Sequence, residues 1–140
     1  YDIEGAPEEQ PSQADWSRGI QLVADRLDDV GEGVGLEDTP RFPESPLECL
    51  ARHVEDAGSC SSPVDAATDP ELAQAEAQAA ADAGIQHESM NDYLCNEDVC
   101  PAVIDQYIVY RDAHHLTESV SLALASAVEE RILRPLLLEE

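Results

Sequence analysis

The sequence predicts an α/β fold in which helices cover a largely parallel sheet. Amphipathic segments with a helical period alternate along the chain with short apolar segments, an order typical of this architecture. The predicted strands are too few and too short to make a stable sheet by themselves. At 140 residues, the chain is long enough for one domain or for a piece of a larger one. We therefore expect part of the sheet to lie outside this sequence.

The first predicted element is a helix that begins at Asp15, after an acidic, irregular lead-in over residues 1–13. Two glycines follow this helix, and a short strand over 34–37 then runs into a Thr-Pro loop. Apolar residues recur every three or four positions along the helix, which places them on one face: Trp16, Ile20, Val23, Leu27 and Val30.

Two further helices are indicated by their start signals. Ser45-Pro46-Leu47-Glu48 has the form of a capping box with proline at the first helical position, and this helix is expected to stop near Gly58. Asp69-Pro70-Glu71 starts the next helix, which runs through an alanine-rich stretch to Gly84.

The C-terminal half of the sequence predicts a strand over 85–90, an extended segment over 104–110 and a long final helix over 117–133. We treat residues 14–140 as one structural unit after the lead-in. The final helix carries an apolar stripe along one face: Leu116, Val120, Leu124, Val128 and Ile132.

The charge balance is strongly acidic. The chain has 31 acidic residues against seven basic ones, a formal net charge of −24. Such a surface repels phosphate backbones, which argues against nucleic acid as a partner, and it lacks the basic cluster that would bind an anionic membrane. No apolar run approaches the ~20 residues that a membrane helix needs.

The four cysteines, at positions 49, 60, 95 and 100, formally allow three pairings. They fall into two local pairs. We favour disulfides, which would imply an oxidising compartment outside the cytoplasm. Free thiols and metal binding are the alternatives, although the spacings differ from the Cys-x-x-Cys pattern of zinc sites.

The segment most informative for chemistry contains Asp112 and His115, between a predicted strand end and the last helix. An aspartate three residues before a histidine can accept the Nδ1 proton of the imidazole, which leaves Nε2 free to act as a base toward a serine hydroxyl. A position just ahead of a helix disfavours the imidazolium. Two alternatives stay open: Asp112 caps a turn, or it begins a metal site together with His114 and His115.

This segment, Tyr-Arg-Asp-Ala-His-His-Leu-Thr over 110–117, follows a local cysteine pair and Cys100-Pro101. It resembles the last block of SGNH-domain proteins, and most closely that of the extracytoplasmic SGNH domain attached to acyltransferase-3 membrane proteins. In that family the block reads roughly as an aromatic residue, then Arg-Asp-x-x-His-Leu-Thr, then a helix. Glu37-Asp38-Thr39-Pro40, followed by Cys49 and Cys60, is similar to the family's central strand and first disulfide.

The resemblance implies a three-layer, flavodoxin-like SGNH sheet flanked by helices, with residues 14–140 as the C-terminal portion and the N-terminal half missing. It implies that Asp112 is the triad acid and His115 the base, and that the disulfides are Cys49–Cys60 and Cys95–Cys100. It assigns His114 no role and implies no cofactor and no metal.

The chain departs from the family in lacking its Gly-Asp-Ser nucleophile block. Asn91 and Asn96 do not follow a Gly-x pair as the family's oxyanion asparagine does. We therefore expect the isolated chain to be inactive, because triad members depend strongly on one another.

By the resemblance, the parent protein would be an SGNH esterase or O-acyltransferase that acts on cell-surface glycans. It would be extracytoplasmic, with an acyl-bearing or acyl-accepting carbohydrate as partner. An acyltransferase-3 domain in the same chain would attach it to the membrane. The alternative is a non-catalytic, disulfide-stabilised extracytoplasmic domain that binds a glycan or a protein.

Overall fold

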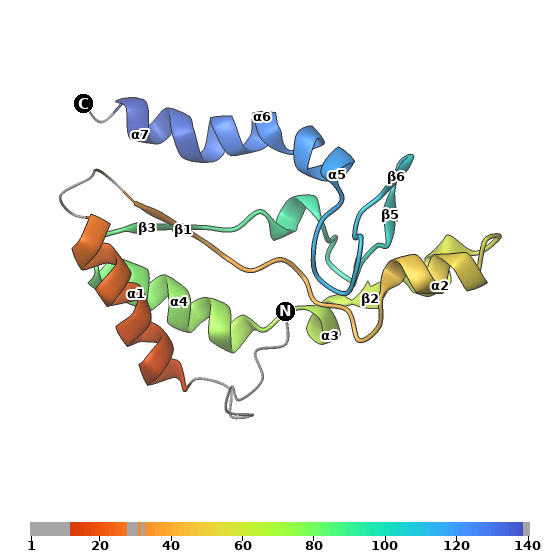
Figure 1. The fold of residues 1–140 in the computed structure, drawn as a ribbon, viewed down its shortest axis with the longest axis horizontal. Coiled ribbons are helices and arrows are strands. Elements are labelled where there is room, and N and C mark those ends of the chain that lie inside the picture. Colours follow the sequence, from red (N-terminus) through yellow and green to blue (C-terminus); the bar gives the residue numbers. More distant parts are fainter. Residues whose placement is uncertain (1–11, 28–30, 32, 139–140) are drawn as a thin grey trace.

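The computed structural model describes residues 12–27, 31 and 33–138, and these form three layers. In the middle layer, β1 (Val34–Leu36) pairs in parallel with β3 (Gln86–Glu88). Helices α1 (Gln13–Leu27) and α4 (Pro70–Asp82) lie on one side of these strands, and the C-terminal helical segment lies on the other (Figure 1). The predicted α/β architecture is confirmed, with a sheet as small as the sequence indicates.

Helices α1 and α4 pack side by side and are joined by a polar contact between their facing sides. The Trp16 indole Nε1 donates a hydrogen bond of 2.6 Å to the Glu76 carboxylate, which is buried. The predicted cap of α4 forms, because the Asp69 side chain accepts from the backbone N–H of Leu72 at 2.9 Å. Gly84, with φ at +71°, follows the C-terminal end of α4 and lies in the short connection to β3. Val30 lies outside the described residues.

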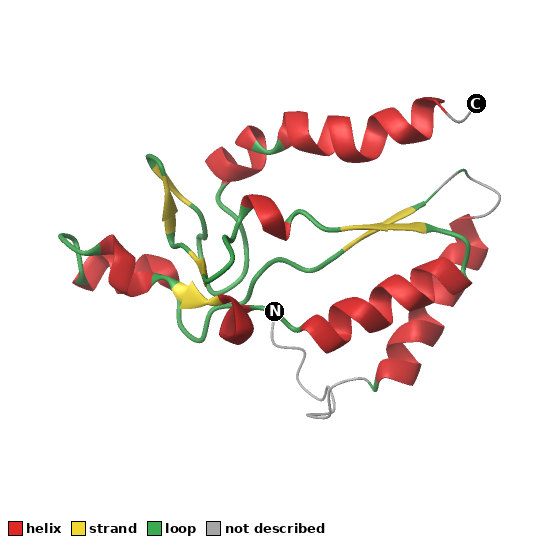
Figure 2. Cartoon of the chain, turned by 180° about the vertical axis from the view of Figure 1, so that it is seen from behind, coloured by secondary structure: helices red, strands yellow, loops and turns green. Residues whose placement is uncertain are grey.

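A smaller part of the molecule extends away from these layers (Figure 2). It contains α2 (Pro46–Arg52), η1 (Ala57–Cys60), β2 (Ser62–Pro63), α3 (Val64–Ala67) and β4 (Val99–Cys100), and β2 pairs with β4 in antiparallel fashion. The prediction that the helix starting at Pro46 runs to near Gly58 was wrong, since α2 ends at Arg52. Val54 is 83% exposed, so no apolar face continues beyond that point to hold further turns. Ser45 occupies the N-cap position, but its side chain makes no capping hydrogen bond.

The segment predicted as extended over 104–110 is a tight hairpin. Strands β5 (Val103–Ile104) and β6 (Tyr107–Ile108) pair in antiparallel fashion across two turn residues. The first of these, Asp105, has φ at +53°, a left-handed conformation that aspartate tolerates better than most residues. The apolar pattern alone did not show that the chain reverses here.

The final helix is interrupted rather than continuous. It consists of α5 (Glu118–Ala123), α6 (Ala125–Val128), the π-helical turn η3 (Glu129–Leu133) and α7 (Arg134–Leu138). Pro135 has no N–H to donate to a carbonyl of the preceding turn, which accounts for a change of hydrogen-bond register just before it. The predicted stripe still faces inward at its two buried positions, Val120 and Ile132.

Arg131 fixes this helical segment to the chain that leaves β3. Its guanidinium donates to both carboxylate oxygens of Asp92 at 2.7 and 2.8 Å and to the carbonyl of Ser89 at 2.7 Å. The same group lies 4.8 Å from the ring centroid of Tyr93, in η2 (Asn91–Tyr93). Because an arginine fork that pairs with both oxygens is geometrically specific, this contact sets the position of the helix over β3.

The main hydrophobic core lies where the layers meet the smaller part. Tyr110 and Val109 are completely buried in it, and the Tyr110 ring packs against Phe42 with centroids 4.6 Å apart. Burial without a hydrogen-bond partner in the described part of the chain raises the pKa of the Tyr110 hydroxyl. Tyr110 thus serves as an apolar anchor immediately before residues 111–115.

The structure contains the disulfides Cys49–Cys60 and Cys95–Cys100. Cys100 is completely buried in the main core, whereas the first disulfide joins α2 to η1 in the smaller part. Among the described residues, no helix combines the length and the apolar character needed to cross a membrane.

Removal of either disulfide should lower stability, but with different consequences for the core. The double variant Cys95→Ala/Cys100→Ala is expected to lower the free energy of unfolding by roughly 2–3 kcal/mol, chiefly because the unfolded chain regains its loop entropy. Urea denaturation followed by tryptophan fluorescence measures this loss. Cys49→Ala/Cys60→Ala is the matched comparison. It should lower the free energy of unfolding by a similar amount and leave the near-ultraviolet circular dichroism of Phe42 and Tyr110 unchanged. Loss of that circular dichroism would contradict the separation of the first disulfide from the main core.

Candidate active site

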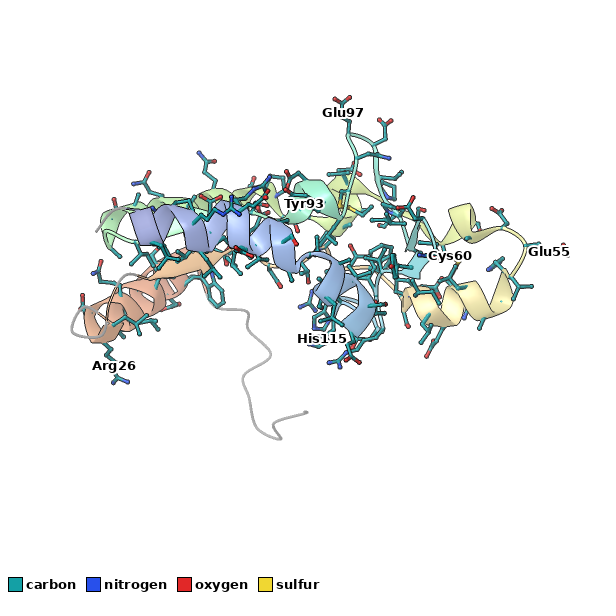
Figure 3. The ribbon with its side chains drawn as sticks, turned by 90° about the horizontal axis from the view of Figure 1, so that it is seen from above. Arg26, Glu55, Cys60, Tyr93, Glu97 and His115 are labelled. Carbon is teal, nitrogen blue, oxygen red and sulfur yellow. A yellow bond between two sulfur atoms is a disulfide. The ribbon has the colours of Figure 1, made fainter. Side chains whose placement is uncertain are left out.

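The loop of residues 111–115 connects the core anchor Tyr110 to α5. It is closed at its base by an antiparallel bridge between Tyr110 and Leu116, and by a hydrogen bond of 2.9 Å from the Arg111 N–H to the His115 carbonyl. Figure 3 shows His115 at the surface near the middle of the molecule, next to the start of the C-terminal helical segment. The loop is therefore a short, closed turn that holds polar side chains at the surface.

Asp112 and His115 form a close, directly bonded pair within this loop. Nδ1 of His115 lies 2.8 Å from Oδ2 of Asp112 and 3.0 Å from Oδ1. The His115 side chain is 53% exposed, and its Nε2 has no hydrogen-bond partner among the described residues. The carboxylate thus fixes the proton on Nδ1 and leaves Nε2 available to a group that approaches from outside.

The Asp112 carboxylate also accepts backbone hydrogen bonds from its own loop. The N–H groups of His114 and His115 donate to Oδ1 at 3.0 and 2.8 Å. These two bonds, together with the His115 side chain, hold the pKa of the Asp112 carboxyl well below its usual range. The turn-capping role considered from the sequence and the contact with His115 therefore coexist in one carboxylate.

Thr117 explains why a helix begins directly after the loop. Its hydroxyl accepts from the N–H of Val120 as the N-cap of α5 and donates to the Ile108 carbonyl at 2.7 Å. His115 therefore lies two residues ahead of a capped helix N-terminus, as the sequence predicted.

Two residues near the Asp112–His115 pair, the dyad, were given no catalytic role by the sequence reasoning. The ring of His114 lies against that of His115 with centroids 4.0 Å apart, and its Nδ1 is buried without a partner in the described part of the chain. Thr39, just after β1, donates its hydroxyl proton to the His114 carbonyl at 2.6 Å. A Thr-Pro pair at the end of a strand was the available signal for Thr39, but the sequence does not reveal its partner 75 positions later.

A pocket of about 370 Å³ opens beside the end of β1. It is lined by Glu37, Thr39, Arg41, Asp69, Glu76 and Asn91, among others. This is the carboxyl end of the parallel strands, where open α/β sheets place their ligands. Neither Asp112 nor His115 lines the pocket, but Thr39 connects its wall to their loop.

The geometry of Asp112, His114 and His115 is that of a hydrogen-bonded Asp–His pair rather than of a metal site. One ligand atom each from Asp112, His114 and His115 lies within 4.8 Å of the others. However, Nδ1 of His115 is already in direct contact with the carboxylate, and Nδ1 of His114 is buried. An ion with ligand distances near 2.0–2.2 Å would have to break the Asp112–His115 bond. A second group, Cys49, His53 and Cys60, has both sulfurs committed to a disulfide.

The chain thus combines α/β layers with an exposed Asp–His pair just before the last helical segment. Comparisons with known proteins show the family that shares this arrangement of elements. The family profile of the SGNH domain that is fused to AT3 domains matches residues 2–130, and the chain belongs to this family.

A solved structure shares the fold. It is the periplasmic domain of a lipopolysaccharide acetyltransferase from Salmonella ser. Paratyphi A, with 17% sequence identity and a TM-score of 0.61. The alignment covers 86% of this chain and 48% of the solved one, so the chain corresponds to about half of that domain. No curated protein sequence matches the chain.

Proposed function

We propose that this chain supplies the Asp112 and His115 half of a Ser-His-Asp triad to an SGNH esterase or O-acyltransferase that acts on cell-surface glycans. The observation that supports this most directly is the bond between the Asp112 carboxylate and Nδ1 of His115, in a histidine whose side chain is about half exposed. The serine would come from polypeptide outside this chain, in the half of the domain that the chain does not span.

The proposed reaction uses each group in a defined way. Nε2 of His115 takes the proton of the serine hydroxyl as the serine oxygen attacks the acyl carbonyl, and Asp112 stabilises the resulting imidazolium. The imidazolium then protonates the leaving group, and an acyl-serine forms. In the second half, His115 takes a proton from a sugar hydroxyl or from water. That oxygen accepts the acyl group, and the serine recovers its proton.

The location of the chain and the domain organisation of its parent protein are also part of the proposal. Membership of a family whose SGNH domains are fused to AT3 domains supports an acyltransferase-3 membrane domain in the same parent chain as the source of the acyl group. Two disulfides support a location outside the cytoplasm, because thiols are kept reduced inside it. The isolated chain would then be inactive, and the complete domain would be attached to the membrane through its parent.

A serine-directed fluorophosphonate probe tests this function in the full-length parent protein. The probe should label one serine upstream of this chain, because His115 activates that hydroxyl. Labelling should be lost in His115→Ala and retained in His53→Ala, which removes an exposed histidine from the smaller part. Absence of labelling, or labelling that persists unchanged in His115→Ala, would favour the non-catalytic binding domain instead.

A further inference from the structure

The loop that carries the dyad is positioned from outside by the chain that leaves β1. We propose that Thr39 is a positioning residue for His115: its hydroxyl, bonded to the His114 carbonyl, holds the peptide on which the imidazole depends. The proposal rests on the function proposed above and extends it to a residue outside the triad.

The bonds around residues 111–115 fall into two groups. The first lies within the loop: the Arg111 N–H to the His115 carbonyl, and the N–H groups of His114 and His115 to Asp112. These bonds determine the shape of the loop but not its place on the protein.

The second group joins the loop to the segment after β1. Thr39 donates to the His114 carbonyl at 2.6 Å, and the Phe42 N–H donates to the Ala113 carbonyl at 2.7 Å. Phe42 is itself buried against Tyr110. Through this group, the loop takes its position from the sheet and the main core.

The Thr39 bond is placed where it bears directly on the dyad. The His114 carbonyl and the His115 N–H belong to one planar peptide group. Thr39 holds the carbonyl end of that plane, and Asp112 accepts from the N–H end at 2.8 Å. Rotation of this peptide would move the N–H away from the carboxylate and turn the imidazole that follows it, so a bond at either end restrains both.

Packing around the imidazole adds to this restraint. The ring of His114 lies against that of His115, with 4.0 Å between centroids, and the His114 ring is attached to the residue whose carbonyl Thr39 holds. A shift of that residue would therefore move the surface on which His115 rests. Catalytic geometry is sensitive to displacements of about 1 Å, so a hydroxyl outside the proposed triad still affects the rate.

The test compares substitutions of Thr39 in the full-length parent, with hydrolysis of para-nitrophenyl acetate as the assay. Thr39→Val keeps the shape but leaves the His114 carbonyl without its donor. It should lower kcat by about 10- to 100-fold and change KM little, the size expected for one lost hydrogen bond that acts on positioning. Thr39→Ser, which restores the hydroxyl, should stay within about threefold of the wild type.

Ser59→Ala is the matched control, because the Ser59 hydroxyl also donates to a backbone carbonyl, that of Asp56 at 2.8 Å, in the smaller part of the molecule away from the dyad and the pocket. It should leave kcat unchanged. Amide hydrogen exchange gives a second readout, and exchange at His115 should accelerate in Thr39→Val but not in Ser59→Ala. If Thr39→Val does not fold, Thr39→Ala and Thr39→Ser form a pair that differs by the hydroxyl alone.

The outcomes separate this proposal from the proposed function. Wild-type kcat in Thr39→Val, or an equal loss in Thr39→Ser, would overturn the positioning role while His115→Ala still abolished turnover. Unchanged turnover in His115→Ala itself would instead overturn the proposed function. A fall in kcat that the serine variant reverses supports both.

Discussion

Replacement of His115 by alanine in the full-length parent is expected to reduce kcat/KM for an acetyl ester by about 10⁴-fold or more. Nε2 is the imidazole nitrogen of His115 that remains to exchange protons with an external hydroxyl, because Nδ1 is bonded to Asp112. Loss of the base from a Ser-His-Asp triad removes most of its rate enhancement, since the other members act through it. Initial rates of para-nitrophenyl acetate hydrolysis at several substrate concentrations provide the measurement.

His53→Ala is the control for this variant. His53 is exposed and follows α2 in the smaller part of the molecule, so its removal should leave kcat/KM within about twofold of the wild type, as for most surface substitutions. A His115→Ala protein that folds normally and retains wild-type turnover would contradict the assignment of the base.

Asp112→Asn should give the second large effect, a fall in kcat of about 10⁴-fold with the loop retained. The asparagine oxygen can still accept the N–H groups of His114 and His115, which now donate to Oδ1 of Asp112. Its amide nitrogen, however, is a donor and cannot accept the proton on Nδ1 of His115. The imidazole would then favour the other tautomer, with Nε2 protonated and unable to act as a base.

Asp56→Asn is the matched control for the loss of one carboxylate. Asp56 also accepts the backbone N–H of a residue three positions later, Ser59, at 3.3 Å, but it lies in the smaller part, away from the dyad. Its replacement should leave kcat unchanged. A comparable loss in both variants would show that the effect of Asp112→Asn comes from net charge or folding rather than from the tautomer.

The lowered pKa of Asp112 predicts how the stability difference between wild type and Asp112→Asn depends on pH. The pKa of this carboxyl is lower in the folded chain than its ordinary value of 3.8. Its ionisation therefore stabilises the folded state at neutral pH, and this contribution is lost as the pH falls below about 4 toward the folded pKa. The difference in Tm between the two proteins should thus be largest near neutral pH and should shrink in acid. A difference that is constant from pH 7 to pH 2 would contradict the cause we assign to the shift.

The helices were predictable because their signals are local. The period of Trp16, Ile20 and Val23, and the cap at Asp69, depend on residues within a few positions of one another, so α1 and α4 form where the sequence indicates. Elsewhere the apolar pattern was insufficient. The tight turn at Asp105 and the early end of α2 are local features that this pattern did not reveal. The π-helical turn before Pro135 did have a local signal, which the apolar stripe concealed.

The dyad is likewise local, and this explains how much of the site the sequence indicated. Asp112 and His115 are three residues apart, so a single tight turn brings their side chains together, and no distant segment is needed to do so. The resemblance over residues 110–117 pointed to the same two residues. It gave no role to His114, whose ring contact with His115 is visible only in three dimensions.

The amino-acid order by itself determined the fold class, the helix starts, the acidic surface and the pair of side chains proposed for catalysis, because each follows from spacing within one turn or one helix. Only the tertiary structure decided where that pair is held. Thr39 and His114 are far apart in sequence, and Phe42 packs on Tyr110 through the core. Such contacts form because burial of the core brings the end of β1 against the loop before α5. No short-range sequence pattern predicts that contact.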